Sequence, residues 1–316
     1  MGWARIVSFC LALAPVIAGN LKVARRIRQK TASATRRGSL CYLGRLLCTQ
    51  NDVSVLSSFT ADGSRVTRKL RFGDECATES TVTCKNPAEW RCDGQCGGCP
   101  CDYDASAGLS AHYMQTMFEQ LGPWCSAASA TSVLMIGLGG GELPQHLLHH
   151  CPRMHIEAVE LNRDVIAMAR TYFGLGEAET RFAGRLSIEQ DDALTAVKQR
   201  SLTGDGSSAA GGQPAASGSS KYDAVLVDCF SGGGEVPESC RSRSFAETVK
   251  AILKPGGVML QNIWHYSKMR QQVPAEFNAT KATYGDVFEG GVDDLLVPMP
   301  AKIRWVDVLK ATKGGV

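Results

Sequence analysis

Hydrophobic and polar positions follow two alternating patterns in the second half of the chain. Short, nearly continuous apolar runs such as "AVLV" lie at 133–136, 155–160, 185–189, 222–228 and 258–263. Stretches with helical spacing lie between them, at 142–150, 164–173, 192–200 and 244–253. Strands that are apolar on both faces are typical of a parallel sheet covered by helices on each side. We therefore predict an α/β fold over 126–316, with a doubly wound, mostly parallel sheet.

One segment interrupts this alternation. "TGDGSSAAGGQPAASGSSK" at 203–221 consists almost entirely of Gly, Ser and Ala. Such a composition cannot bury a core, so the pattern predicts a disordered surface loop inside the domain, not a domain boundary.

The preceding region, 51–125, has a different pattern. "DVSVLSSF" and "RVTRKLRFG" alternate with a period of two, and Asp62-Gly63 lies between them. This arrangement favours a β-hairpin. A helix is expected over 110–122, "SAHYMQTMFEQLG". The sequence thus predicts a small β-rich region before the larger domain.

The N-terminus has the features of a targeting sequence. Residues 1–20, "MGWARIVSFCLALAPVIAGN", combine a basic start, a short apolar run and small residues near Ala18, as signal peptides do. The apolar run is shorter than the roughly 20 residues that span a bilayer, so no stable membrane span is expected. Residues 21–50 are basic and rich in Ser and Thr, as transit peptides and linkers are. We expect passage through the secretory pathway, ending in a plastid by two-part targeting or in a secreted or luminal location. A signal anchor and a plain solvated basic tail are the alternatives.

The charge distribution changes the expected partners. The formal net charge is +3, but no Asp or Glu precedes Asp52, and the rest of the chain is net acidic. A folded part without basic excess argues against nucleic-acid binding. With 44% apolar residues, the chain can bury a substantial core.

A glycine-rich loop follows the first strand of the predicted sheet. In "VLMIGLGGGELPQHLLHHC", its glycines are Gly137, Gly139, Gly140 and Gly141. Glycines allow a sharp turn and a close approach of the backbone to a ligand, and the helix that follows favours a negative group. Ligands of doubly wound sheets bind at such a strand end.

Two acidic residues extend this pattern. Glu160 ends the next strand, where a carboxylate can accept hydrogen bonds from both hydroxyls of a ribose. Asp192 follows the third strand, in the position to meet an adenine amine, although helix capping also explains an Asp there. "GLGGGE" does not fit the G-x-G-x-x-G pattern of dinucleotide enzymes. The pattern therefore favours S-adenosylmethionine as the bound nucleoside.

These motifs resemble the spermidine synthase-like group of Rossmann-like class I methyltransferase folds. The resemblance rests on "VLMIGLGGGELPQHL", "IEAVELNRDVIAMARTYFG", "RLSIEQDDAL", "YDAVLVDCF" and "LKPGGVMLQNI", and covers about 113–263. Within the group, the glycine loop is most similar to the C-terminal half of methyltransferase-like proteins that modify elongation factor. The hairpin at the N-terminal side is compatible with the small β domain of the group.

The resemblance also implies two departures from the true aminopropyltransferases. Those enzymes carry an Asp in the glycine loop, where this chain has Gly140, and a D-x-x-D motif after the fourth strand, where it has Asp228 and Ser231. The paired carboxylates hold and deprotonate a polyamine amine. Glu235 and Glu238, in the following loop, are the candidates to replace the missing acid.

Three functions remain open. The first is a methyltransferase in which Asp228 orients an amine or acts as base, with a protein or a small amine as acceptor. The second is an aminopropyltransferase that uses decarboxylated S-adenosylmethionine, and the third is a non-catalytic nucleoside-binding or assembly protein. Trp264, His265 and Tyr266 border the same cleft and either shape an acceptor pocket or pack at a strand end. A homodimer is left open.

The cysteines and histidines allow several kinds of site. Six of the 13 cysteines are Cys76, Cys84, Cys92, Cys96, Cys99 and Cys101. They favour disulfides over a zinc site in an oxidising compartment, and six cysteines allow 15 pairings. Cys229 beside Asp228 is expected to be buried and inert. His146, His149 and His150 favour a solvated helix face over a metal site, so no metal is expected.

Overall fold

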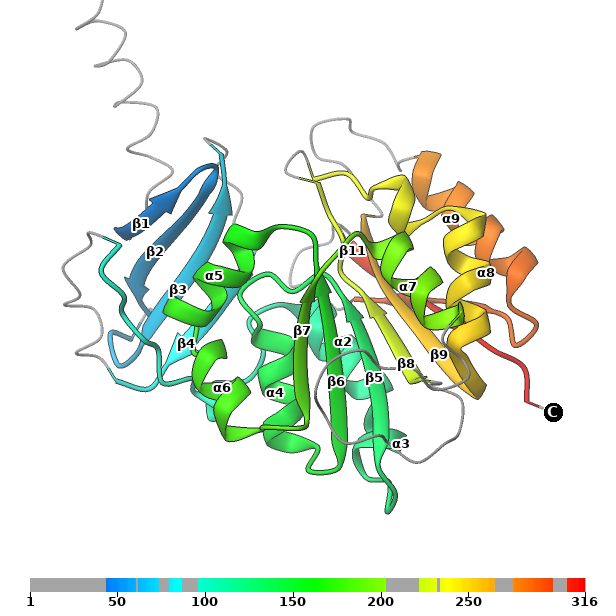
Figure 1. Ribbon diagram of the computed structural model, residues 1–316, viewed down its shortest axis with the longest axis horizontal. Coiled ribbons are helices and arrows are strands. Elements are labelled where there is room, and N and C mark those ends of the chain that lie inside the picture. Colours follow the sequence, from blue (N-terminus) through cyan, green and yellow to red (C-terminus); the bar gives the residue numbers. More distant parts are fainter. Residues whose placement is uncertain are drawn as a thin grey trace, which may run out of the picture.

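The computed structural model describes residues 44–60, 62–73, 80–86, 96–202, 222–231, 234–264, 275–297 and 306–315. The predicted signal-like segment, the predicted loop at 203–221, and Cys76, Cys92, His265 and Tyr266 lie outside these ranges. The larger sheet has helices on both faces, and a smaller sheet lies at one end of the molecule (Figure 1).

The larger sheet has the strand order β10-β11-β9-β8-β5-β6-β7. Five neighbouring strands run parallel and confirm the five predicted strands: β5 (Thr131–Ile136), β6 (Met154–Glu160), β7 (Leu186–Gln190), β8 (Tyr222–Val227) and β9 (Leu253–Trp264). The chain moves outward from β5 through β6 to β7 and then returns to β8 on the other side of β5. The order therefore reverses between β5 and β8, which confirms the doubly wound fold.

Two antiparallel strands extend this sheet beyond the prediction. β10 (Val292–Leu296) pairs with β11 (Val306–Thr312), which pairs with β9. Asp293, Asp294 and Asp307 interrupt their apolar runs, so neither segment has the continuous hydrophobic pattern that identified the parallel strands.

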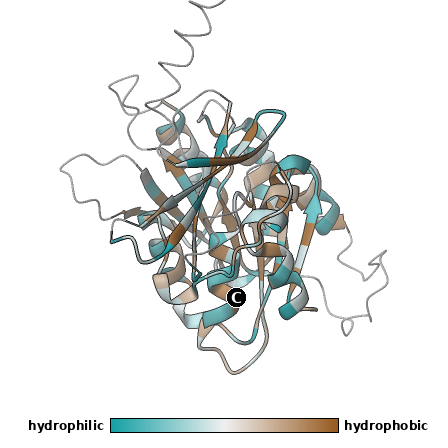
Figure 2. Cartoon of the chain, turned by 90° about the vertical axis from the view of Figure 1, so that its left-hand side faces the viewer, coloured by the Kyte–Doolittle hydropathy of each residue, from teal (hydrophilic) through white to brown (hydrophobic). Residues whose placement is uncertain are grey.

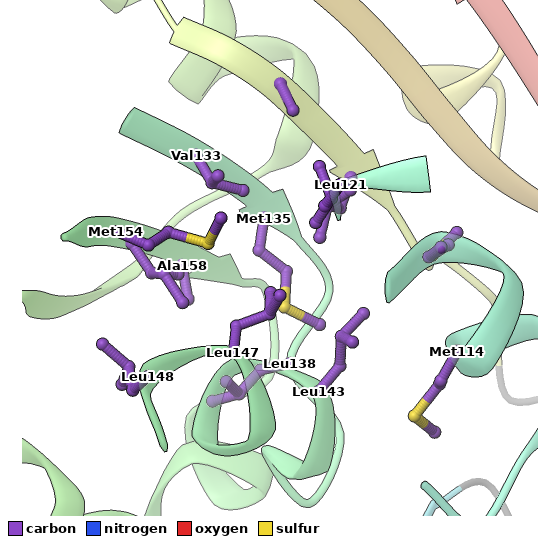
Figure 3. Close-up of a cluster of buried hydrophobic side chains, with 14 of the residues drawn as sticks. Met114, Leu121, Val133, Met135, Leu138, Leu143, Leu147, Leu148, Met154 and Ala158 are labelled. Atoms are coloured by element: carbon purple, nitrogen blue, oxygen red, sulfur yellow. The ribbon is translucent and has the colours of Figure 1, made fainter. Parts of the chain in front are cut away.

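Side chains of β5 alternate between two cores. Val133 and Met135 pack with α2 (His112–Gln120), α4 (Glu142–His150) and α6 (Leu175–Arg181), and Figure 3 shows this cluster. Leu134 and Ile136 pack with α7 (Ala193–Leu202), α8 (Arg243–Ile252) and α9 (Ala275–Val287). Each fully buried side chain of this kind stabilises the fold by about 2 kcal/mol. Burial on both faces fixes where the strands end, and hence where the site lies.

The smaller sheet is an antiparallel meander of β1 (Arg45–Gln50), β2 (Val53–Phe59), β3 (Val66–Phe72) and β4 (Ser80–Cys84). The predicted hairpin is confirmed, because β2 and β3 pair with Phe59 opposite Val66. Asp62 stabilises its turn by accepting hydrogen bonds from the Thr60 hydroxyl and the Ser64 amide. The boundary at residue 51 is wrong, however, since β1 lies within the segment interpreted as a linker. The basic residues around "RLLCTQ" hid its strand pattern.

One face of the smaller sheet packs on α5 (Arg163–Tyr172). Val55, Leu70 and Val82 from the sheet form a core with Val165 and Met168. Seen from this end, hydrophobic stretches of the strands lie beside hydrophilic turns (Figure 2). α5 thus has the smaller sheet on one side and the parallel sheet on the other, and it joins the two parts.

Disulfides account for the cysteine segment as far as the structure describes it. Cys48 pairs with Cys96, and Cys84 pairs with Cys101, so both bonds tie the smaller sheet to the segment that follows it. Cys99 is disulfide-bonded as well. Two more disulfides, Cys125–Cys151 and Cys229–Cys240, lie in the larger domain. Within the described ranges, no three Cys, His, Asp or Glu side chains form a metal-binding group.

None of the helices in the described ranges combines the length and the apolar character needed to cross a membrane. α3 (Gly122–Cys125) is a single turn that leads into β5.

Candidate functional site

Acidic residues gather at the carboxyl ends of the parallel strands. Glu160 is the last residue of β6, Asp192 follows β7, and Asp228 follows β8. The glycine loop follows β5, between β6 and β8, where the strand order reverses. The three acidic residues and the glycine loop that the sequence singled out therefore lie along one edge of the sheet.

The glycine loop is shaped by the protein around it. A Cβ on Gly137 would overlap the main-chain carbonyl of Asp228, and Gly137 has φ +88°. A Cβ on Gly140 would lie 2.7 Å from the ring of Phe173, which is fully buried. Gly141 has φ +74° and faces Leu175, and Gly139 has φ +54° and faces Ser80. Backbone geometry and packing thus require these glycines, in addition to any ligand.

Glu160 is tied to the glycine loop. Its Oε2 accepts a hydrogen bond of 3.0 Å from the Leu138 amide, and its Oε1 accepts one of 2.9 Å from the Asn162 amide. Burial raises the pKa of Glu160, and the negative charge of Asp228 adds to the effect. The Gly139 amide also favours the charged form of Glu160. A carboxylate has about four acceptor positions, so the group can still accept a hydrogen bond from a ligand hydroxyl.

Asp192 is a helix cap in the structure. Its Oδ1 accepts a hydrogen bond of 3.1 Å from the Thr195 amide in the first turn of α7. This is the capping role that the sequence offered beside ligand contact. The two roles are compatible, and contact with an adenine stays a prediction.

Asp228 lies in a network that the sequence did not reveal. Its Oδ2 accepts a hydrogen bond of 2.7 Å from the Tyr113 hydroxyl, and its Oδ1 accepts one of 2.8 Å from the Asn262 amide nitrogen. Tyr113 comes from α2 and Asn262 from β9. Burial raises the pKa of Asp228, while both hydrogen bonds favour its charged form.

Asn262 has an unused acceptor. The residue is 4% exposed, and its side-chain oxygen has no hydrogen-bond partner among the described residues. Its nitrogen must face the carboxylate of Asp228 when that group is ionised, so the oxygen is the free end. A buried acceptor without a partner is costly, and a ligand N–H next to Asp228 would satisfy it.

Glu142 is a further buried acid of this region that the sequence reading did not select. It is 2% exposed, and its carboxylate accepts hydrogen bonds from the amide and the hydroxyl of Ser110. Polar letters inside apolar patterns, Asn262 in "VMLQNIW" and Glu142 at the start of a helix, are the signals that could have identified these residues.

The residues at or near the second acidic position of the D-x-x-D motif are exposed to solvent. Ser231 and Glu238 are exposed, and the Ser231 hydroxyl accepts a hydrogen bond from the Glu235 amide. Glu235 is exposed too. Cys229 is not a thiol nucleophile, because it forms a disulfide with Cys240.

The expected solvated histidine face is partly wrong. His146 is buried, its ring packs against Phe118 at 4.8 Å, and its Nδ1 lies 3.4 Å from the Tyr103 hydroxyl. His149 is half-buried and His150 is exposed. The segments 96–111 and 112–120 cover this side of α4, and they were not expected to pack there.

A hollow of about 380 Å³ lies elsewhere, along α8 and α9. Its charged residues already have protein partners, as Arg243 has Asp286 at 2.7 Å and Lys250 has Glu289. It is not a competing site.

The fold and the strand-end site together define the class. They are those of a Rossmann-like class I S-adenosylmethionine-dependent methyltransferase fold. Residues 115–306 match the spermine/spermidine synthase domain, and the chain belongs to this family.

Relatives within this family differ in activity. The chain is 29% identical over 156 residues to a polyamine aminopropyltransferase of Vibrio vulnificus, covering 49% of this chain and 43% of that protein. It is 30% identical over 137 residues to the eEF1A lysine and N-terminal methyltransferase of Homo sapiens, covering 42% of this chain and 17% of that protein. The matches thus span less than half of either relative.

A solved structure shares the fold. A probable spermidine synthase from Corynebacterium glutamicum superposes with a TM-score of 0.56 at 15% identity, over 85% of this chain and 80% of that one. The chain is therefore a spermidine synthase-like transferase by family, and its reaction has to be argued from the site.

Proposed function

We propose that the protein is an S-adenosylmethionine-dependent methyltransferase whose acceptor is an amine, on a protein or on a small molecule. The observation that carries the proposal is the packing at Gly140. Aminopropyltransferases carry an Asp there to hold the amine of their donor, but here the ring of Phe173 lies 2.7 Å from where its Cβ would be. Phe173 is fully buried, so moving its ring aside would disturb the packing around it.

The donor side of the site fits an adenosine. Glu160 lies against the glycine loop and keeps acceptor capacity for a ribose hydroxyl, and Asp192 lies one strand further along the same edge. S-adenosylmethionine, when bound, supplies an electrophilic methyl group. The protein then has to bind, orient and deprotonate an acceptor.

The acceptor side fits an amine. Asp228 can accept one N–H and the Asn262 side-chain oxygen a second, which directs the lone pair of the nitrogen. Asp228 takes up the proton at Oδ1 or Oδ2, and its raised pKa suits a group that holds a proton. The Tyr113 hydroxyl, which donates to Oδ2, keeps the carboxylate in place.

Calorimetry with S-adenosylmethionine, its decarboxylated form and methylthioadenosine tests the proposal. We expect S-adenosylmethionine to bind at least about tenfold more tightly than the decarboxylated form. A preference for the decarboxylated form would make the protein an aminopropyltransferase. Absence of binding to all three would make it a non-catalytic relative.

The aminopropyltransferase alternative has one specific observation in its favour. Asp228 accepts hydrogen bonds from the Tyr113 hydroxyl and the Asn262 side-chain nitrogen. This arrangement suits a primary amine of a polyamine as well as the amine of a lysine. Ser231, Glu235 and Glu238 are exposed, so these three residues are poor candidates for the second carboxylate of that reaction.

We also propose that the protein enters the secretory pathway and resides in an oxidising compartment. The proposal covers a luminal location and a plastid reached by this route. Four disulfides between described residues support an oxidising compartment, because such bonds persist mainly outside reducing compartments. Titration of free thiols in the purified, unreduced protein tests this, and stoichiometric labelling of Cys125 and Cys151 would contradict it. Sedimentation of the same sample decides between a monomer and a homodimer.

A further inference from the structure

Glu142 connects the glycine loop to a distant part of the chain. It is the first residue of α4 and directly follows Gly141. Its Oε1 accepts a hydrogen bond of 2.9 Å from the Ser110 amide, and its Oε2 accepts one of 2.5 Å from the Ser110 hydroxyl. The Glu142 carboxylate, which is 2% exposed, thus receives both hydrogen bonds from one residue, Ser110, outside its own helix.

Ser110 lies at the start of the helix that carries Tyr113. The N-cap residue of α2, Ala111, provides no side-chain cap. The bonds between Glu142 and Ser110 therefore fix the entry to this helix. Three residues after Ser110, the Tyr113 hydroxyl donates to Asp228. One line of contacts runs from the donor loop to the acceptor carboxylate.

The Ser110 hydroxyl has a second acceptor within reach. Its oxygen lies 3.3 Å from the main-chain carbonyl of Thr81 in β4. A hydroxyl has one proton, so it can donate to only one acceptor at a time. When Glu142 is ionised, the proton points to Glu142. When Glu142 takes a proton from water at Oε2, that new O–H can donate to the Ser110 oxygen, whose own proton then points to Thr81.

We propose that Glu142 is a positioning residue that sets Tyr113 against Asp228 through Ser110, and that the two hydrogen-bonding states of Ser110 place Tyr113 differently. The proposal rests on the proposed function, since it assigns a control to the acceptor side of that site. Glu142 and Ser110 are not among the residues assigned above to the donor or to the acceptor.

Burial raises the pKa of Glu142 to about 7, against the lowering effect of the Ser110 bonds, so both states are populated near neutral pH. Tyr103 faces the carboxylate from the loop before α2, with Asp104, paired to Arg65 at 3.1 Å, next to it. One turn along α4, burial lowers the pKa of His146 to about 4, so this group stays neutral. His112 begins α2 beside Tyr113.

Tyrosine labelled with ¹³C at Cζ provides the test, because this carbon reports the hydrogen bonding of the hydroxyl. Tyr113→Phe assigns the resonance, which is then followed from about pH 5.5 to about pH 8.5. Wild type should show a step with a midpoint near 7, which Glu142→Gln removes and Ser110→Ala reduces by at least about half. Glu119→Gln on the exposed side of α2 and His112→Gln serve as matched controls and should keep the step.

Two results would overturn the proposal. A wild-type resonance that does not change with pH would mean that Ser110 has one state. A step that persists in Glu142→Gln would belong to Asp228 or another group. Calorimetry with S-adenosylmethionine and its decarboxylated form on the same samples separates the two questions. A preference for the decarboxylated form, or no binding of either, would contradict the proposed function without altering the Tyr113 step.

Discussion

The two sides of the proposed site agree with the family motifs to different degrees. On the donor side, the glycine loop, Glu160 and Asp192 all stand where the motifs of the family predict them. On the acceptor side, Asp228 is present, but Ser231 stands where the D-x-x-D motif has its second Asp. A disulfide also joins Cys229, the residue after Asp228, to Cys240. In the proposed site, the residues assigned to the adenosine keep the pattern of the family, whereas those assigned to the acceptor depart from it.

This difference explains why relatives of both activities match. An adenosine-bearing donor requires the same ribose carboxylate and bare backbone, whichever group is transferred. In the proposed site, the attacking amine is selected by a few side chains on β8, β9 and α2, or directly after them. The predictions below test whether the two sides can be separated by mutation.

Asp228→Asn should have the largest effect. Removal of the proton acceptor is expected to lower the methyl-transfer rate about 100-fold or more, while donor affinity changes little. Tritiated S-adenosylmethionine first identifies the acceptor by its label, and the rate of tritium transfer to that acceptor is then measured. Calorimetry of the donor serves as the control. Full activity in this variant would make Asp228 a structural residue.

The pH dependence of stability should reveal the buried acid that links the two sides. The pKa of Glu142 is raised to about 7 from an ordinary value of 4.5, so the folded state holds this proton more tightly than the unfolded state. Its contribution is fully favourable below about pH 4.5 and is lost as the pH rises through 7, a change of about 3 kcal/mol.

Denaturant unfolding at several pH values measures this contribution. Glu142→Gln should flatten the fall in the free energy of unfolding between about pH 5 and about pH 8, and Glu119→Gln should not. Equal slopes in wild type and Glu142→Gln would contradict the assignment.

Gly140→Asp tests the packing on which the proposed distinction from the aminopropyltransferases rests. The new side chain would meet the Phe173 ring and the Ser80 hydroxyl, so we expect a loss of about 2 kcal/mol in the free energy of unfolding. Decarboxylated donor should still bind no more tightly than before. A stable variant that gains affinity for the decarboxylated form would show that the loop can accept an Asp.

Glu160→Gln should have a smaller and purely donor-side effect. Loss of one charge-assisted ribose hydrogen bond weakens donor binding about tenfold, or about 1.4 kcal/mol. Calorimetry with S-adenosylmethionine measures it, and Glu157→Gln on the same strand is the matched control. An unchanged dissociation constant would remove Glu160 from the donor site.

The local motifs were predictable because their geometry follows from a few neighbouring residues. The parallel strands are apolar on both faces, and their carboxyl ends must meet at one edge, so the places of Glu160 and Asp228 could be foreseen. Contacts between distant segments could not. Tyr113 is separated from Asp228 by 115 positions and Ser110 from Glu142 by 32, and no short pattern encodes such pairs.

Burial of polar residues was the main source of error. His146 was expected in solvent because its helix face has three histidines, but a segment from outside the predicted sheet covers it. β1 and β11 were missed because their apolar runs are short. Arg45 begins β1, and Asp307 and Lys310 interrupt β11.

A crystal structure with S-adenosylhomocysteine tests the central claim most directly. The account predicts the adenosine at the carboxyl end of β5, both ribose hydroxyls on the Glu160 carboxylate, and the thioether sulfur facing Asp228. A nucleoside bound at another surface, or ribose hydroxyls held by residues other than Glu160, would contradict it.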